Sequence, residues 1–154
     1  NVDFEKMSNA VLDYTAPAHR CEFVRDLDGV RWINDSKATN LDAMEKAILS
    51  QDRPLILIAG GKDKGFEFDD IAPLVKERVR SAVLIGEMKD RIAASWSGTT
   101  TQKAVTLPEA VALARATAQA GDAVLFSPGT SSFDMFKNYG ERGNQFKDAV
   151  QALE

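Results

Sequence analysis

The segment 34–40 has the sequence NDSKATN and brings an acid, an amine and hydroxyl groups together between a β-prone run and a helical one. A helix N-terminus offers free backbone N–H groups and the positive end of the helix dipole, and both favour an anion. Lys37 adds a positive charge, Thr39 adds a hydroxyl, and Asp35 could accept hydrogen bonds from a ribose diol. A capping loop in which Asp35 and Asn40 bind backbone amides is an equally good interpretation, and composition leaves both open.

A glycine-rich stretch, GGKDKG, occupies residues 60–65. Glycine lets the backbone approach a ligand closely, and Lys62 and Lys64 could bind a carboxylate or a phosphate. The stretch is not a Walker phosphate-binding loop, because Phe66 follows Gly65 where that motif needs Lys and then Ser or Thr. An ordinary turn between a strand and a helix explains the stretch about as well.

A third polar stretch, SPGTSSFDMFKNY, covers residues 127–139. Its hydroxyl residues, Ser132 among them, follow a predicted buried strand and precede a predicted short helix, which is again a geometry that binds anions. A hydroxyl-rich cap is the alternative. Phe136 is expected in the core, whereas Phe133 could lie either in the core or beside a ligand.

The pair His19-Arg20 precedes the first predicted strand and the single cysteine, Cys21. The Arg20 guanidinium could reach a phosphate across a domain cleft, although a solvated surface charge explains it as well. We expect His19 to be a structural hydrogen-bonding residue and Cys21 a small strand residue, since one histidine supports neither a histidine-based metal site nor a nucleophile–base pair.

The elements that must position these stretches alternate along the chain. A turn at Asp28-Gly29 joins two β-prone runs, which predicts a hairpin, and the apolar run PLILIA at 54–59 predicts a strand buried on both faces. The order predicts a Rossmann-like α/β domain of three layers, with a mostly parallel sheet that the N-terminal hairpin makes mixed. Strands are expected at 22–26, 30–34, 54–59, 81–85, 104–105 and 123–126, and helices at 3–14, 40–49, 69–77, 89–94, 107–118 and 140–153.

Ligands of such sheets bind beyond the carboxyl ends of the strands. The stretches 34–40, 59–66 and 127–139 all leave predicted strand ends there, so we interpret them as one site.

Length and composition limit the remaining possibilities. The 154 residues suit one domain, and we place a boundary near residue 18, with 1–18 as the tail of a preceding domain and 19–154 as the domain itself. The net charge of −4 gives no support for a nucleic-acid partner. We expect no membrane segment, since no apolar run approaches the ~20 residues of a membrane span, and we expect a cytoplasmic protein.

Together these residues resemble the Mur ligase family, and in particular its D-glutamate-adding branch. The stretch DSKATN is the most specific piece, because sister ligases and folylpolyglutamate synthases look different there, and the glycine loop is the loosest. The matching pieces, in chain order, are His19-Arg20, RWINDSKATN at 31–40, Gly60-Gly61 with Lys64, Ser127-Pro128, SFD at 132–134 with FKN at 136–138, and ERGN at 141–144 with Phe146.

The resemblance implies an ATP-dependent ligase of three domains. This chain would be the last domain, which accepts the amino acid, preceded by a UDP-sugar-binding domain and a central P-loop domain. ATP and UDP-N-acetylmuramoyl-L-alanine would form an acyl phosphate, and the amine of D-glutamate would attack it during peptidoglycan synthesis. The Mg²⁺ ligands would belong to the central domain, so no metal ligand is expected in this chain.

The resemblance also assigns roles by position. Lys37 would lie near the reacting acyl group, and Arg20 and Asp35 would contact the phosphate and the ribose of ATP. The D-glutamate site would be formed by Thr39, Lys64, Ser132, Phe133 and Tyr139. Two alternatives stay open at this point: another Mur-type ligase, or a module that binds an anionic metabolite without chemistry.

Overall fold

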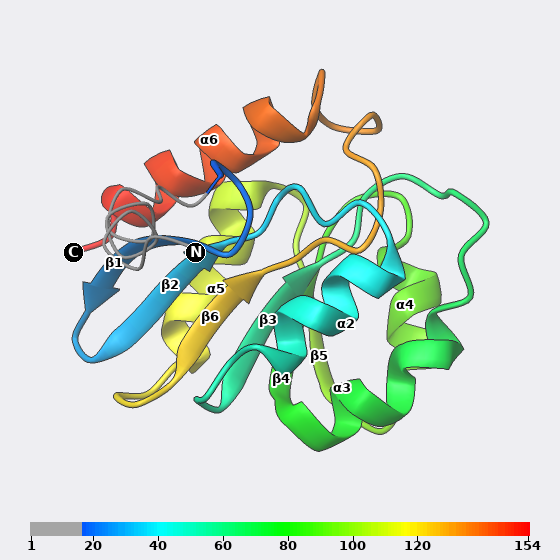
Figure 1. Cartoon of the computed structure of the whole chain (residues 1–154), viewed down its shortest axis with the longest axis horizontal. Helices are drawn as coiled ribbons and strands as arrows, with labels where there is room; N and C mark the ends of the chain where they lie inside the picture. Colours follow the sequence, from blue (N-terminus) through cyan, green and yellow to red (C-terminus); the bar gives the residue numbers. More distant parts are fainter. Residues whose placement is uncertain (1–16) are drawn as a thin grey trace, which may run out of the picture.

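The computed structural model describes residues 17–154, which form a six-stranded sheet covered by helices on both faces (Figure 1). The predicted helix at 3–14 and most of the predicted tail at 1–18 lie outside this range. The strands are β1 (Glu22–Leu27), β2 (Val30–Asn34), β3 (Leu55–Ala59), β4 (Val79–Leu84), β5 (Thr100–Lys103) and β6 (Ala123–Phe126). The helices are α2 (Leu41–Leu49), the 3₁₀ helix η1 (Phe68–Ile71), α3 (Ala72–Arg78), α4 (Lys89–Ser95), α5 (Leu107–Thr117) and α6 (Tyr139–Gln151).

The strand order is β1-β2-β6-β3-β4-β5. β1 pairs with β2 in antiparallel fashion, and every other neighbouring pair is parallel. The hairpin turn uses positive φ angles of 51° at Asp28 and 78° at Gly29, as tight two-residue turns require. The mixed, mostly parallel sheet predicted from the sequence is therefore confirmed.

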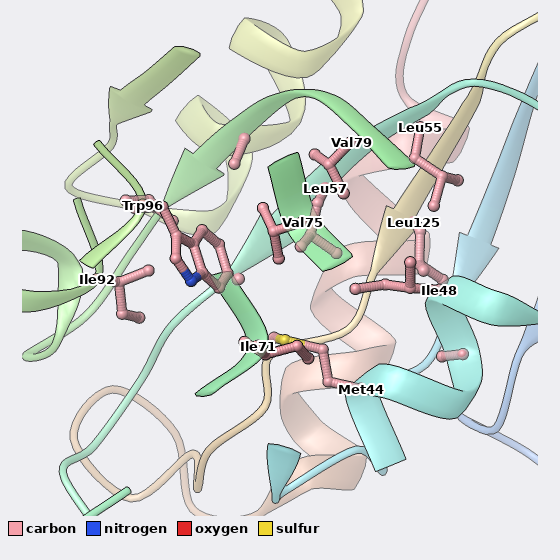
Figure 2. Packing of buried hydrophobic residues seen from close by; sticks show 14 of the residues in the cluster. Met44, Ile48, Leu55, Leu57, Ile71, Val75, Val79, Ile92, Trp96 and Leu125 are labelled. Carbon is pink, nitrogen blue, oxygen red and sulfur yellow. The ribbon is translucent and has the colours of Figure 1, made fainter. Parts of the chain in front are cut away.

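Two hydrophobic clusters lie on opposite faces of the sheet. Alternate residues of β3 divide between them, with Leu55 and Leu57 in one cluster and Ile56 and Ile58 in the other. The first cluster packs α2, α3 and α4 against the sheet, with Met44 and Trp96 among its buried side chains (Figure 2). The second packs α5 and α6 against the other face. A strand buried on both faces must be apolar throughout, which explains the run PLILIA.

Some sequence predictions are wrong in detail. Helix α2 begins after Asn40, whose side chain accepts from the N–H of Ala43 as the capping interpretation predicted, and its last residue, the apolar Leu49, is exposed. The predicted helix at 69–77 is divided into η1 and α3, and β4 begins at Val79 and ends at Leu84 rather than spanning 81–85.

The fifth strand was placed too late in the chain. β5 is Thr100–Lys103, a polar strand that pairs only with β4 at the sheet edge, where no continuous apolar run is needed. Val105, in the predicted strand at 104–105, is exposed, and its N–H donates to Glu109 just before α5 begins.

The short helix predicted within 127–139 is also absent. The N–H groups of Met135 and Phe136 both donate to the carbonyl of Ser132, which closes a single turn. Asn138 then caps α6 by accepting from the N–H of Glu141. The chain therefore forms a turn in which the helix was expected, and Phe136 packs partly buried against the second cluster as predicted.

The topology brings three loops together at the carboxyl ends of the parallel strands, where the orange and cyan segments meet in Figure 1. We name them the β2 loop (34–40), the β3 loop (59–66) and the β6 loop (127–139). β6 lies between β2 and β3, so the carboxyl ends of these parallel strands are neighbours. The β2 and β3 loops lead to helices on one face and the β6 loop leads to α6 on the other, which is a switch point of the kind where ligands bind.

Candidate functional site

Backbone hydrogen bonds join the three loops. The N–H of Lys62 donates to the carbonyl of Ser131 at 2.9 Å, and the N–H of Gly129 donates to the carbonyl of Ala38 at 2.9 Å. Gly61 is required at the first junction, because a Cβ there would lie 2.3 Å from the carbonyl oxygen of Ser131. The convergence of the loops predicted from the sequence is therefore confirmed.

Arg142, in the first turns of α6, holds two of the loops. Its side chain is fully buried, and Nε donates to the Ser36 hydroxyl at 3.0 Å while Nη2 donates to the Ser36 carbonyl at 2.7 Å. Nη1 donates to the Thr130 carbonyl at 3.1 Å. Burial lowers the pKa of this guanidinium to about 10, with Asp134 acting in the opposite direction, so Arg142 remains charged at neutral pH.

A hollow of about 420 Å³ opens beside the β2 loop. The side chains of Arg20, Asp35 and Lys37 line it, together with Cys21 and the exposed Lys46 of α2. The structure thus brings together both predicted ATP contacts and the predicted catalytic lysine. The hollow is lined by three cationic side chains and by two carboxylates, those of Asp35 and Asp42, and Asp42 accepts from the Lys46 ammonium at 2.7 Å. Arg20 and Lys37 can therefore bind a phosphorylated ligand, and Asp35 can accept from a hydroxyl.

Asp35 is buried at the base of this hollow. Its carboxylate accepts from the Ser127 hydroxyl at 2.7 Å and from the N–H of Cys21 at 3.1 Å. Burial raises the pKa of Asp35, and the hydrogen bonds from Ser127 and Cys21 oppose that change. The side chain therefore combines a fixed orientation with the hydrogen-bond accepting capacity that a ribose needs.

Cys21 is not activated. Desolvation, followed by the negative charge of Asp35, raises the pKa of its thiol to about 11, so the thiolate form is scarce at neutral pH. The absence of an activated thiol agrees with the sequence analysis, but the prediction that Cys21 is a strand residue is wrong, because it lies just before β1 with a φ of 43°.

Three of the residues predicted to bind the amino-acid substrate, Lys64, Thr39 and Tyr139, take part in two contacts, the second of them with Lys37. Lys64 is exposed, and its ammonium donates to the carbonyl of Thr39 at 3.4 Å, which joins the β3 and β2 loops. The Lys37 ammonium lies over the Tyr139 ring, 5.9 Å from the centroid. Such cation–π contacts stabilise a lysine position without neutralising its charge.

The remaining two predicted substrate residues differ in exposure. Ser132 is buried and lies one residue beyond the Lys62–Ser131 junction, whereas Phe133 is 65% exposed. Phe133 is therefore not a core residue, and its contact with a ligand stays a prediction.

His19 contacts both Lys37 and Tyr139. Its Nδ1 accepts from the side-chain amide of Asn34 at 2.9 Å, its ring packs edge-on to Tyr139 at 6.1 Å, and its carbonyl accepts from the N–H of Lys37 at 2.9 Å. Burial, followed by the charge of Lys147, lowers the pKa of His19. The structural role expected from the sequence is confirmed.

Sequence reasoning missed the function of Arg142. Its signal was present, because Arg142, Phe146 and Val150 are spaced four residues apart and share the buried face of α6. An arginine on an apolar stripe must satisfy its donors internally. Nothing in the sequence indicated which carbonyls would accept.

Within residues 17–154, no group of three or more His, Cys, Asp or Glu side chains is placed to hold a metal ion. Over the same residues, no helix is long and apolar enough to cross a membrane.

The family profile described as "Mur ligase, glutamate ligase domain" matches residues 19–130. This chain belongs to the Mur ligase family.

Curated Mur ligases named UDP-N-acetylmuramoylalanine--D-glutamate ligase are similar to most of this chain. The protein from Geotalea daltonii is 50% identical over 96% of this chain, and that from Geotalea uraniireducens is 54% identical over 88% of it. The matches cover 33% and 30% of those relatives, so the chain spans about a third of their length.

Solved structures confirm the fold. The UDP-N-acetylmuramate-alanine ligase from Thermotoga maritima has a TM-score of 0.67 at 12% identity and covers 98% of this chain and 36% of its own. A pseudomurein peptide ligase type C from Methanothermus fervidus has a TM-score of 0.66 at 18% identity and covers 99% of this chain and 32% of its own.

Replacing Arg142 should destabilise the folded chain, because its buried guanidinium holds the β2 and β6 loops together. Arg142→Lys leaves some of the Ser36 and Thr130 acceptors without donors, so we expect the free energy of unfolding to fall by about 2–4 kcal/mol. Urea unfolding of the 154-residue chain would measure this. Arg20→Lys, at an exposed arginine, is the matched control and should change stability little; equal losses in both variants would contradict the role of Arg142.

The lowered pKa of His19 predicts a pH dependence of stability. The unfolded chain takes up the proton near pH 6.5, whereas the folded chain resists it, so stability is present above that pH and is lost as pH falls toward the folded pKa. His19→Asn should remove this contribution, and asparagine tolerates the φ of 64°. Urea unfolding at pH 7.5 and 5.5 should show a smaller loss in the variant; equal losses would contradict the assignment.

Proposed function

We propose that this chain is the amino-acid-accepting, C-terminal part of an ATP-dependent ligase that joins D-glutamate to UDP-N-acetylmuramoyl-L-alanine in cytoplasmic peptidoglycan synthesis. The observation that carries the proposal is the meeting of Lys37, Lys64 and the hydroxyl-bearing loops at one edge of the sheet. The printed names of the curated relatives support the choice of D-glutamate.

In the proposed reaction the carboxylate of UDP-N-acetylmuramoyl-L-alanine attacks the γ-phosphoryl group of ATP, which gives an acyl phosphate and ADP. The amine of D-glutamate then attacks the acyl carbon, and inorganic phosphate leaves as the amide forms. Both steps depend chiefly on positioning and on neutralising anionic charge. Mg²⁺, with ligands in the central domain, would neutralise phosphate charge.

The hollow beside the β2 loop supports binding of part of ATP. Arg20 would donate to a phosphate, and Asp35 would accept from the ribose, since Ser127 and the Cys21 N–H already fix its orientation. Lys37 would stabilise negative charge on the reacting acyl group from its position over Tyr139.

D-glutamate presents two carboxylates, and the β3 and β6 loops offer matching groups. Lys64, whose ammonium reaches the Thr39 carbonyl, would bind one carboxylate in an ion pair, and the Thr39 hydroxyl would donate to the same carboxylate. Ser132 would donate its hydroxyl, and Phe133 and Tyr139 would cover the aliphatic part of the substrate. The remaining domains of the same enzyme would supply the UDP-sugar site and the P-loop.

A direct test uses the full-length enzyme that contains this chain. Release of phosphate from ATP should require both UDP-N-acetylmuramoyl-L-alanine and D-glutamate, with L-glutamate and L-alanine as poor substitutes. The 154-residue chain alone should fold but give no product. Product formation by the chain alone, or turnover that prefers another amino acid, would count against the proposal. Absence of any ligation would favour a binding module instead.

Lys64→Ala should raise the KM for D-glutamate in the full-length enzyme. The loss of one charge-assisted contact corresponds to roughly 1.5–3 kcal/mol, or about tenfold or more. Lys62→Ala, at an exposed lysine of the same loop, is the matched control and should have little effect. Steady-state kinetics with varied D-glutamate would measure both; an unchanged KM in Lys64→Ala would remove Lys64 from the substrate site.

A further inference from the structure

A fourth loop, the turn between β4 and α4, contacts the candidate site although no sequence motif indicated it. We name it the β4 turn (85–88). The N–H of Met88 donates to the carbonyl of Gly61 at 3.0 Å, so this turn packs against the glycine loop. The N–H of Glu87 donates to Oδ2 of Asp134 at 3.0 Å, which connects it to the β6 loop as well.

The hydrogen bond from Glu87 to Asp134 holds a stretch of the β6 loop that makes few other hydrogen bonds to the rest of the chain. The loop is fixed upstream by the junction of Lys62 with Ser131 and downstream where Asn138 caps α6. Among the hydrogen bonds of residues 17–154, the stretch 132–137 is joined to another loop only by Asp134. Ser132 and Phe133, which immediately precede Asp134, are among the residues proposed to contact D-glutamate.

The β4 turn is shaped to receive this carboxylate. Gly86 has a φ of +73°, and a Cβ there would lie 2.5 Å from Oδ2 of Asp134 and 2.7 Å from the Cα of Gly61. Both neighbours approach so closely that a side chain at position 86 would force them apart. The glycine and the carboxylate thus form one fitted contact.

We propose that Asp134 is a positioning residue for the amino-acid substrate: by binding the N–H of Glu87 it fixes the turn that presents Ser132 and Phe133. The inference rests on the proposed function of the site. Asp134 itself does not need to touch substrate, since its oxygen is engaged by the backbone of the β4 turn. A carboxylate placed on an anionic substrate would in any case repel it.

A substitution series in the full-length enzyme separates positioning from general stability. Asp134→Ala removes the acceptor, and we expect the KM for D-glutamate to rise roughly tenfold while the KM for ATP stays within about twofold. Asp134→Asn keeps an oxygen that can accept from Glu87 and should restore the KM. Asp148→Ala, at an exposed aspartate of α6, is the matched control and should behave as wild type.

Gly86→Ala tests the contact from the other side. It keeps the carboxylate but displaces it, so the KM for D-glutamate should rise as in Asp134→Ala. Three results would overturn the inference: equal rises in the KM for ATP and for D-glutamate, failure of Asp134→Asn to rescue, or an unchanged KM in both Gly86→Ala and Asp134→Ala.

Hydrogen exchange in the 154-residue chain keeps this inference distinct from the proposed function. The Glu87 N–H should lose protection in Asp134→Ala and keep it in Asp134→Asn, and equal protection in all forms would overturn the proposed contact. A wild-type full-length enzyme that fails to ligate D-glutamate would instead refute the proposed function, whatever the exchange rates show.

Discussion

A fully buried guanidinium, that of Arg142, sets the arrangement of the site. Removing a charged group from water costs several kcal/mol in proteins, so the structure must supply acceptors, and it does so with the Ser36 hydroxyl and the carbonyls of Ser36 and Thr130. These acceptors belong to two loops that are far apart in sequence. The β2 and β6 loops can therefore take their observed conformations only when α6 is docked. Phe146 and Val150 dock it through the second hydrophobic cluster, so the core and the site are coupled through a single helix.

The strand order explains why these loops meet at all. β6, the last strand, is inserted between β2 and β3, so three carboxyl ends lie side by side although the chain between them forms the other half of the sheet. The loops then lead to helices on opposite faces, which leaves a hollow that the backbone does not close. The antiparallel β1 contributes in a different way, because the residues just before it carry His19 and Arg20 to the β2 loop. Figure 1 shows how this N-terminal segment lies beside α6.

The sequence predicted the fold where local signals were strong. The hairpin at Asp28-Gly29, the buried run of β3 and the cap at Asn40 depend on neighbouring residues, and each is confirmed. The edge strand β5 was misplaced because an edge strand needs no apolar run, and the expected helix after Ser132 is replaced by a turn. The meeting of the loops followed from the general rule for parallel sheets, but the donors of Arg142 find their partners through distances of 12 and 106 residues in sequence, which no local pattern contains.

Burial separates the framework of the site from the groups that would meet a ligand. Ser36, Ser127 and Thr130, which the framework hydrogen bonds hold, are fully buried, whereas Lys64 and Phe133 are exposed. Hydrogen bonds and ion pairs to a developing anion are strongest where water is excluded. On this chain alone, the exposed groups face solvent, so their charges are largely screened and their side chains keep their rotamer freedom. A surface that covers them would increase the electrostatic stabilisation and would also reduce the entropy lost on binding. The arrangement therefore supports the proposed function, in which this chain would supply the binding half of the site and another domain would exclude water from it.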